Sequence, residues 1–385
     1  MIIPHDIPED RIREFLQHLP THVRSTLLVE IERMQLYDED IPGAAFILAE
    51  LRAEFRKSGQ SGDRVGNPSR YFFKPIEALF VDRSPERANA GQISRGSLSA
   101  IWEWINQILL PTMAREYCDR TKQLIVSNKP QEAELVAAGF QSKVVKSLEG
   151  ILSTDAGVDG AQHGFAKFTS SRAGFNDLKK VLAALRMRDA LVAFNEALPA
   201  KVDDLGGATL AHVRALLDAL VAKHPDALPF GLTMVTKRLK APWQLLRLAT
   251  KAAHGHDAAD IAATHYAISV SMVLDLIDDK RLALHHALKS NRVPFAKGIL
   301  TEIYDIERAI RARIGRLEKS DWGRRLDEVM AAVEVDLRSE IEAMPGQLHH
   351  VLGSVERHQP AHGLLNALMH KGRNLIGLGH HPDSA

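Results

Sequence analysis

The chain has 385 residues, 45% of them hydrophobic and 25% charged, a composition typical of a folded protein and not of a disordered or collagen-like one. Its 49 basic and 48 acidic residues give a formal charge of +1, so no global field attracts nucleic acid, and we expect no nucleic-acid partner. The single cysteine, Cys118, excludes an internal disulfide framework and a cysteine-based zinc site; with no secretory signal or membrane-length apolar run, it indicates a cytoplasmic protein.

Helical periodicity dominates the first part of the chain. It predicts helices over 8–19, 21–36 and 42–57, followed by a polar loop over 58–70 that is rich in glycine and serine. A long helix is expected from 98 to 126, with Ser97 as its N-cap and a kink where Pro111 removes a backbone donor. A further helix is expected over 130–152.

Glycine-rich sequence after residue 152 marks the expected internal boundary. We predict an N-terminal helical domain over 1–152, a connection with one bridging helix over 153–207, a C-terminal helical bundle over 208–345 and a histidine-rich tail over 346–385. The bridging helix covers 175–197, and three shorter helices follow over 208–223, 229–239 and 242–253.

The last third of the chain carries the most regular helical pattern. A long helix is expected over 257–289, and it is apolar nearly all round between Tyr266 and Ile277, which predicts a central, buried position. Two apolar stripes then follow at helical spacing, separated by a short polar turn, and predict a long antiparallel helical hairpin over 294–344. The stripes are Ile299, Ile303, Ile306, Ile310, Ile314 and Leu317, then Leu326, Met330, Val333, Leu337, Ile341 and Met344. The fold class is therefore all-α, a multi-helix bundle in two helical subdomains.

The segment 70–104 concentrates aromatic and basic side chains: it holds six of the 22 aromatic residues of the chain. Such a cluster is either a local core or an exposed groove for a protein partner, and stacking on single-stranded nucleic acid is a third reading that the low net charge disfavours. The candidate partner-binding residues are Arg70, Tyr71, Phe72, Phe73, Lys74, Arg95, Trp102 and Trp104.

The pair His256-Asp257 resembles the metal-ligand pair of HD-type phosphohydrolases, which hydrolyse phosphoesters with divalent metal ions. With a histidine upstream and an aspartate downstream, the resemblance implies a ligand set of His224, His256, Asp257 and Asp305. The apolar run before such a pair and the glycine after it are absent from this sequence.

Asp275, Asp278 and Asp279 form the second acidic candidate. Their i, i+3, i+4 spacing places three carboxylates on one helix face, as in sites that bind magnesium and diphosphate. A structural salt bridge, for example to Arg281 or Arg292, is the alternative reading.

Seven of the 18 histidines fall in the last 40 residues, and a short amphipathic helix is expected there over 363–379. We expect this helix to dock on the body of the protein, with a partner or a membrane surface as alternatives. The chain has no nucleotide-binding fingerprint, nucleophile elbow or zinc-metalloprotease motif, so we expect no cofactor.

Together these patterns predict a non-catalytic interaction protein that binds a protein partner through 70–104, with the hairpin 294–344 as a second surface. The alternative is a metal-dependent hydrolase or lyase that uses either His256 and Asp257 or the three aspartates of 275–279.

Overall fold

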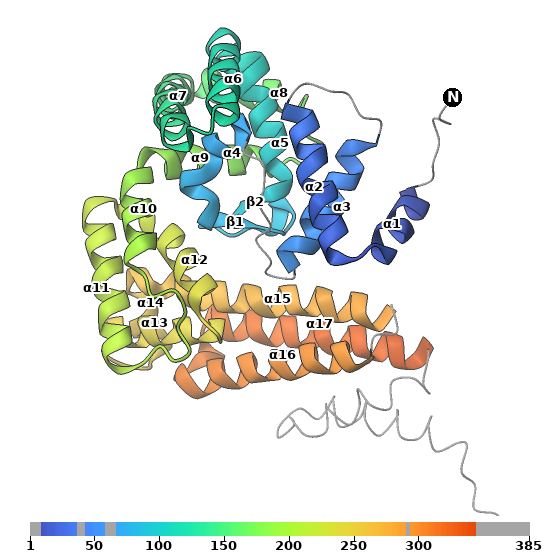
Figure 1. Ribbon diagram of the computed structural model, residues 1–385. Helices are drawn as coiled ribbons and strands as arrows, with labels where there is room; N and C mark the ends of the chain where they lie inside the picture. The colour runs from blue at the N-terminus through green and yellow to red at the C-terminus, as the bar shows by residue number, and fades with distance from the viewer. Residues whose placement is uncertain (1–8, 37–42, 58–66, 290–292, 344–385) are drawn as a thin grey trace, which may run out of the picture. The chain divides into compact units, whose positions relative to one another are not determined.

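The computed structural model describes residues 9–36, 43–57, 67–289 and 293–343. In these ranges the chain is mostly helical and has almost no strand, which confirms the all-α prediction (Figure 1). The predicted tail over 346–385, with its helix at 363–379, lies outside the described residues. The chain divides into two compact units: unit 1 comprises 1–77 and 95–186, and unit 2 comprises 78–94 and 187–385.

Unit 1 contains nine α-helices among its described residues. They are α1 (Glu9–His18), α2 (Thr21–Leu36), α3 (Ala44–Lys57), α4 (Pro68–Phe73), α5 (Arg95–Trp104), α6 (Pro111–Val126), α7 (Pro130–Leu152), α8 (Asp155–Phe165) and α9 (Gly174–Arg186). Helices α1 to α3 share a core of their own, built from Leu16, Leu28, Ile31, Ala44, Leu48, Leu51 and Phe55. A 3₁₀ segment, Lys74–Leu79, follows α4 and leads into unit 2.

The long helix predicted over 98–126 is broken at Pro111, where we expected a kink. Helix α5 ends at Trp104, one π-helical turn follows over Ile105–Leu109, and Leu110 leaves helical geometry at φ −142°, ψ 56°. Pro111 then occupies the first turn of α6, where its missing N–H costs nothing because the first helical donors have no partner within the helix. Ser97, expected as an N-cap, lies inside α5 and donates a hydrogen bond to the buried Asp177 over 2.7 Å.

Unit 2 begins with two short strands, β1 (Phe80–Val81) and β2 (Ile93–Ser94), which pair in parallel with Phe80 opposite Ile93. Its longer helices are α10 (Arg188–Ala197), α11 (Gly207–Lys223), α12 (Leu228–Arg238), α13 (Leu246–Ala252), α14 (Ala258–Ala262), α15 (Ile268–Lys289), α16 (Val293–Arg313) and α17 (Asp321–Ala343). Short 3₁₀ segments connect them: η2 (Pro85–Arg87), η4 (Pro225–Ala227), η5 (Pro242–Leu245), η6 (His265–Ala267) and η7 (Leu317–Lys319).

Two further predicted helices are each divided in the structure. The expected helix 175–197 is interrupted at Met187 and forms α9 and α10. The expected helix 257–289 is divided into α14, a 3₁₀ turn and α15, since Asp257 and the sequence around Thr264 begin new helical segments. Its apolar part is buried as predicted: Tyr266, Val270, Val273, Leu274 and Ile277 have no exposed surface.

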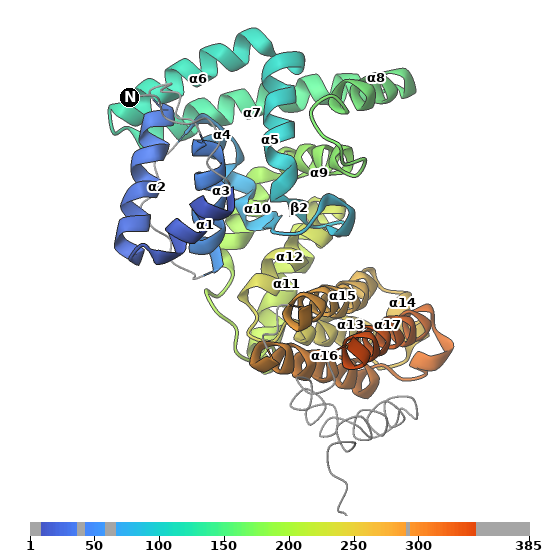
Figure 2. The ribbon, with the colours of Figure 1, turned by 90° about the vertical axis from the view of Figure 1, so that its right-hand side faces the viewer.

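Helices α15, α16 and α17 form a three-helix bundle, seen side by side in Figure 1 and nearly end-on in Figure 2. Both predicted apolar stripes are buried, and α15 contacts both α16 and α17. Both helices of the predicted hairpin therefore pack against α15, and an ion pair between Arg311 and Asp327 over 2.8 Å links α16 to α17. Ile341 and Met344, the last members of the second stripe, lie beyond the described side chains.

Candidate functional site

Unit 2 contains an open pocket of about 630 Å³ whose lining comes from three separate parts of the chain. The loop between β1 and β2 contributes four residues, α15 contributes five and α17 contributes one. The lining residues are Glu86, Arg87, Ala88 and Asn89; Asp275, Asp278, Asp279, Arg281 and Leu282; and Arg325. We call it the arginine–aspartate pocket, because these two residue types supply most of its charge.

Helix α15 supplies the acidic wall. Its buried run ends at Leu274, and the next turns carry Asp275, Asp278 and Asp279, each only partly exposed. Because residues three and four apart lie on the same helix face, the three carboxylates point to one side, as the sequence predicted.

Arginines from distant segments compensate these carboxylates. Arg325 donates a hydrogen bond to Asp275 and lies 3.5 Å from the carboxylate of Asp278. Arg83 forms an ion pair with Asp279, and Arg87 approaches the same carboxylate to 4.0 Å. The alternative interpretation of the acidic cluster as a structural salt bridge therefore agrees with the geometry. The arginines that pair with its carboxylates are Arg83, Arg87 and Arg325.

Arg281, one of the partners suggested from the sequence, instead contacts Asp336 of α17 at 3.2 Å. Arg292, the other, lies outside the described residues.

Burial and neighbouring charges shift the pKa values of two of these guanidinium groups. Burial lowers the pKa of Arg83 below its ordinary value; nearby Asp275 opposes this change and Arg87 adds to it. Burial alone would also lower the pKa of Arg325, but its hydrogen bonds and charge interactions with Asp275 and Asp278 outweigh that effect, and the net pKa is raised. Arg325 is thus held as a cation between two carboxylates.

The loop that carries Arg87 is fixed to unit 2 by specific contacts. Lys237 of α12 donates to the carbonyl oxygen of Phe80 over 2.7 Å, and the hydroxyl of Ser94 donates to the carbonyl of Arg83 over 2.5 Å. Gly91 passes so close to α12 that a Cβ there would lie 1.9 Å from the carbonyl oxygen of Pro229. Only glycine fits this approach, so the loop is positioned by backbone packing as well as by charge.

The residues of the HD-like set have separate structural roles. Asp257 caps the N-terminus of α14 by accepting from the backbone N–H of Ala259 over 3.0 Å, and it pairs with Arg316. One ring nitrogen of His256 lies 3.0 Å from the carbonyl oxygen of Arg313.

The other two members of that set lie elsewhere: His224 follows the C-terminus of α11, and Asp305 pairs with Arg308 on α16. Across the described ranges, no three histidine, cysteine, aspartate or glutamate side chains are grouped so as to hold a metal ion.

Most of the aromatic side chains predicted at a partner groove instead build the core of unit 1. Phe72 is 0% exposed, Phe73 5% and Trp104 2%, so none of the three offers contact surface, and for them the local-core reading holds. Trp102 is partly exposed and packs against Phe72 at 5.4 Å between ring centroids. Aromatic rings supply large apolar areas, and the apolar residues of this segment are used to join α4 to α5, α6 and α7.

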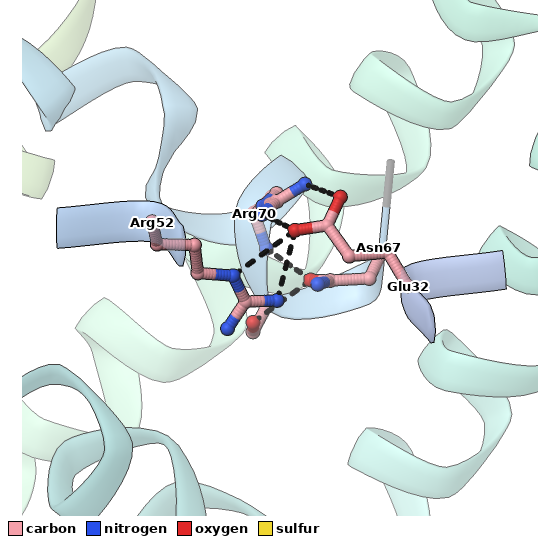
Figure 3. A network of polar contacts seen from close by, with 5 residues as sticks. Glu32, Arg52, Asn67 and Arg70 are labelled. Carbon is pink, nitrogen blue, oxygen red and sulfur yellow. Dashed lines mark hydrogen bonds and ion pairs between the residues drawn. The ribbon is translucent and has the colours of Figure 1, made fainter. Parts of the chain in front are cut away.

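Arg70 is also occupied within the fold. Figure 3 shows Arg52 and Arg70 converging on the carboxylate of Glu32, which is 4% exposed. Arg52 donates to one carboxylate oxygen over 3.0 Å, and Arg70 donates to both, over 2.9 Å to Oε2. Asn67, the N-cap of α4, accepts from the backbone N–H of Arg70 and fixes the start of this helix. The arginine therefore links α4 to α2 by a buried ion pair.

Besides Arg70 and Trp102, three candidates of the aromatic-basic segment keep accessible surface: Tyr71, Lys74 and Arg95. Lys74 is exposed, forms an ion pair with Glu134 and lies 5.9 Å from the ring centroid of Tyr71. Arg95 begins α5 and is half-buried. The four pocket residues Glu86 to Asn89 lie within 70–104 as well, but the sequence reasoning did not single them out because nothing local signals that their loop meets α15.

Comparison with protein-family models, with curated protein sequences and with solved structures finds no match for this chain. Among the described helices, none is both long enough and apolar enough to cross a membrane.

Proposed function

We propose that the protein is a non-catalytic interaction protein and that its partner, a protein, binds at the arginine–aspartate pocket. One observation carries this proposal: both segments expected to contact a partner contribute to the pocket. The segment 70–104 provides Glu86 to Asn89, and the hairpin 294–344 provides Arg325.

The chemistry of the pocket suits recognition. Arginine is enriched among the residues that dominate binding energy at interfaces, because its planar fork makes several directed hydrogen bonds. The ion pairs here are partly exposed, so a partner's charged groups can replace them without first breaking a buried core. The near-zero net charge favours a protein over nucleic acid as the partner, and the lone Cys118 is consistent with a cytoplasmic location.

The pairing of the carboxylates supports a non-catalytic role. A general base or metal ligand needs an accessible lone pair, whereas Asp275 accepts from Arg325 and Asp279 pairs with Arg83. The arginines thus occupy the positions that a reacting proton or ion would need.

Affinity capture with matched variants tests the proposal. Wild-type protein is compared with an Arg87→Ala, Arg325→Ala variant and with a control Arg308→Ala, Arg324→Ala, whose arginines pair with aspartates of their own helices outside the pocket. A partner retained by the wild type and the control is purified, and its affinity for all three proteins is measured by calorimetry. We expect a loss of at least about tenfold for the pocket variant. Equal affinity for all three proteins would refute the proposal.

A second candidate function is a metal-dependent hydrolase or lyase at Asp275, Asp278 and Asp279. The observation in its favour is that all three carboxylates line one pocket beside arginines able to bind a phosphate. A metal ion would have to displace Arg325 from Asp275 and Asp278.

Elemental analysis and thermal shift with Mg²⁺ or Mn²⁺ distinguish the two functions. Stoichiometric metal in the wild-type protein favours the enzyme. A metal-dependent rise of Tm confined to Arg325→Gln favours the interaction protein, because only removal of the guanidinium then opens the site.

A further inference from the structure

We propose that the arginine–aspartate pocket recognises a zwitterionic group: a basic side chain and a carboxylate held close together. This inference deepens the proposed function, since it rests on the same pocket and names the chemistry that a partner presents there. The ligand has two possible sources, a free basic amino acid or the C-terminal residue of a partner protein.

Among the ion pairs formed by the aspartates and arginines of the pocket, those of Asp278 with Arg325 and of Arg87 with Asp279 are the longest, and they leave Asp278 and Arg87 with charges of opposite sign. Arg325 pairs with Asp278 at 3.5 Å, and its contact with Asp275 is the closer of the two. Arg87 lies 4.0 Å from Asp279, beyond hydrogen-bond distance, because Arg83 already holds this carboxylate. Of these aspartates and arginines, Asp278 and Arg87 therefore gain most from an added counter-charge.

A ligand of a single charge fits this arrangement poorly. A free anion would gain Arg87 but would approach Asp275, Asp278 and Asp279. A free cation would gain Asp278 but would meet three guanidinium groups that line the same pocket. A ligand with a basic side chain and a carboxylate places a positive group at Asp278 and a negative group at Arg87, and these two charges together leave the charge balance of the pocket unchanged.

The size and the construction of the pocket suit such a ligand. A volume of about 630 Å³ lies within the range of small-molecule sites and accommodates one or two amino-acid residues. Arg87 is carried by a loop fixed through Lys237 and Gly91, and Asp278 by the bundled helix α15, so both contacts are prearranged. Prearranged charges lose little freedom on binding, which favours selectivity for the matching pair.

Four probes at low salt separate the parts of this chemistry: L-arginine, the peptide Gly-Gly-Ser-Arg, the same peptide with an amidated C-terminus, and Gly-Gly-Ser-Gln with a free carboxylate. We expect calorimetry to detect saturable binding of the first, the second or both. The amidated peptide and the glutamine peptide should each bind at least about tenfold more weakly than the arginine peptide, because each lacks one charge. Tighter binding of L-arginine than of the peptide identifies a free amino acid as the source, and the reverse order identifies a chain end.

Matched variants locate the binding. Asp278→Asn and Arg87→Gln should each weaken binding at least about tenfold, whereas Asp305→Asn and Arg324→Gln, outside the pocket, should leave it unchanged. Circular dichroism and Tm establish that every variant is folded.

The inference is overturned if the amidated and free peptides bind equally, which would show a site for cations alone, or if none of the four probes binds. It is also overturned if inorganic phosphate binds more tightly than both L-arginine and Gly-Gly-Ser-Arg. The partner-capture experiment is independent of these results, so the partner proposal survives if only the zwitterion chemistry fails.

Discussion

Arg325 of α17 donates a hydrogen bond to Asp275 of α15, and this contact joins the last described helix to the central helix of its bundle. The two side chains are 37% and 22% exposed, so the pair is partly shielded from water. Hydrogen bonds to charged groups contribute about 1.5–3 kcal/mol. This contact therefore has a structural role besides its place in the pocket.

Replacing Arg325 by glutamine should lower the free energy of unfolding by about 1–2 kcal/mol, because Asp275 and Asp278 lose their shared cation. Arg324→Gln is the matched control. Its partner Asp321 is 88% exposed, and exposed pairs contribute less than about 1 kcal/mol. Urea unfolding of both variants measures the difference, and equal losses would show that the shielded pair adds nothing.

Removing the buried carboxylate of Glu32 should lower the free energy of unfolding more than Arg325→Gln does. Glu32→Gln should destabilise the protein by about 3 kcal/mol, because Arg52 and Arg70 would keep their charges without the carboxylate that compensates them. Glu50→Gln, which removes a partly exposed pair with Arg13, should cost less than about 1 kcal/mol. Denaturant unfolding separates the two, and a cost for Glu32→Gln no larger than that for Glu50→Gln would contradict the assignment.

A methyl group at Gly91 should displace the loop that carries Arg87. The new Cβ would lie 1.9 Å from the backbone oxygen of Pro229, so Gly91→Ala forces the loop or α12 to move and costs several kcal/mol, on the order of 3. Gly139→Ala in α7 is the opposite control. No atom lies within 4 Å of its added Cβ, and alanine in a helix should stabilise by about 0.5–1 kcal/mol. Thermal unfolding measures the change in Tm for both variants. An unchanged Tm for Gly91→Ala would rule out the close approach of Gly91 to Pro229.

Alkaline pH should weaken the fold through three buried tyrosines. Burial is the main cause that raises the pKa of Tyr117, Tyr266 and Tyr304 above the ordinary value, and the carboxylate of Asp218, which accepts from the Tyr266 hydroxyl, adds to the rise. In the unfolded chain these phenols ionise near pH 10. Their contribution to stability is therefore complete below about pH 10 and is lost as the pH rises towards the folded-state pKa values.

Urea unfolding at a series of alkaline pH values measures this loss, and Tyr266→Phe should reduce its slope. Absorbance of the native protein should show the three phenols ionising later than free tyrosine. Ionisation of all tyrosines near pH 10 in a protein that is still folded would disprove the expectation.

The sequence predicts the helices well where apolar spacing is regular. The stripes from Ile299 to Leu317 and from Leu326 to Leu337 are buried as predicted, because a repeated 3–4 spacing leaves one face that must leave water. Boundaries are less predictable. The end of α5 before Pro111 depends on one π-helical turn, and its hydrogen bonds have no local sequence signal.

The sequence predicted the acidic residues of the candidate site but not their arginine partners. The spacing of Asp275, Asp278 and Asp279 places them on one face, but the arginines that meet them are Arg83 and Arg325, which no local pattern links to α15. The aromatic cluster around Phe72 presents a different difficulty. A run of aromatic and basic residues has the same sequence pattern whether its side chains face solvent or the core of the protein, and here Phe72 is buried. Tertiary packing decides both cases.

The insertion of residues 78–94 into unit 2 has a consequence for biosynthesis. During translation this segment leaves the ribosome well before α12 and α15 exist, because residues 95–186 of the other unit are made in between. A shortened chain that starts at Met187 would lack Arg83, Arg87 and Gly91 from the outset, and its helices would be left with the uncompensated carboxylate of Asp279.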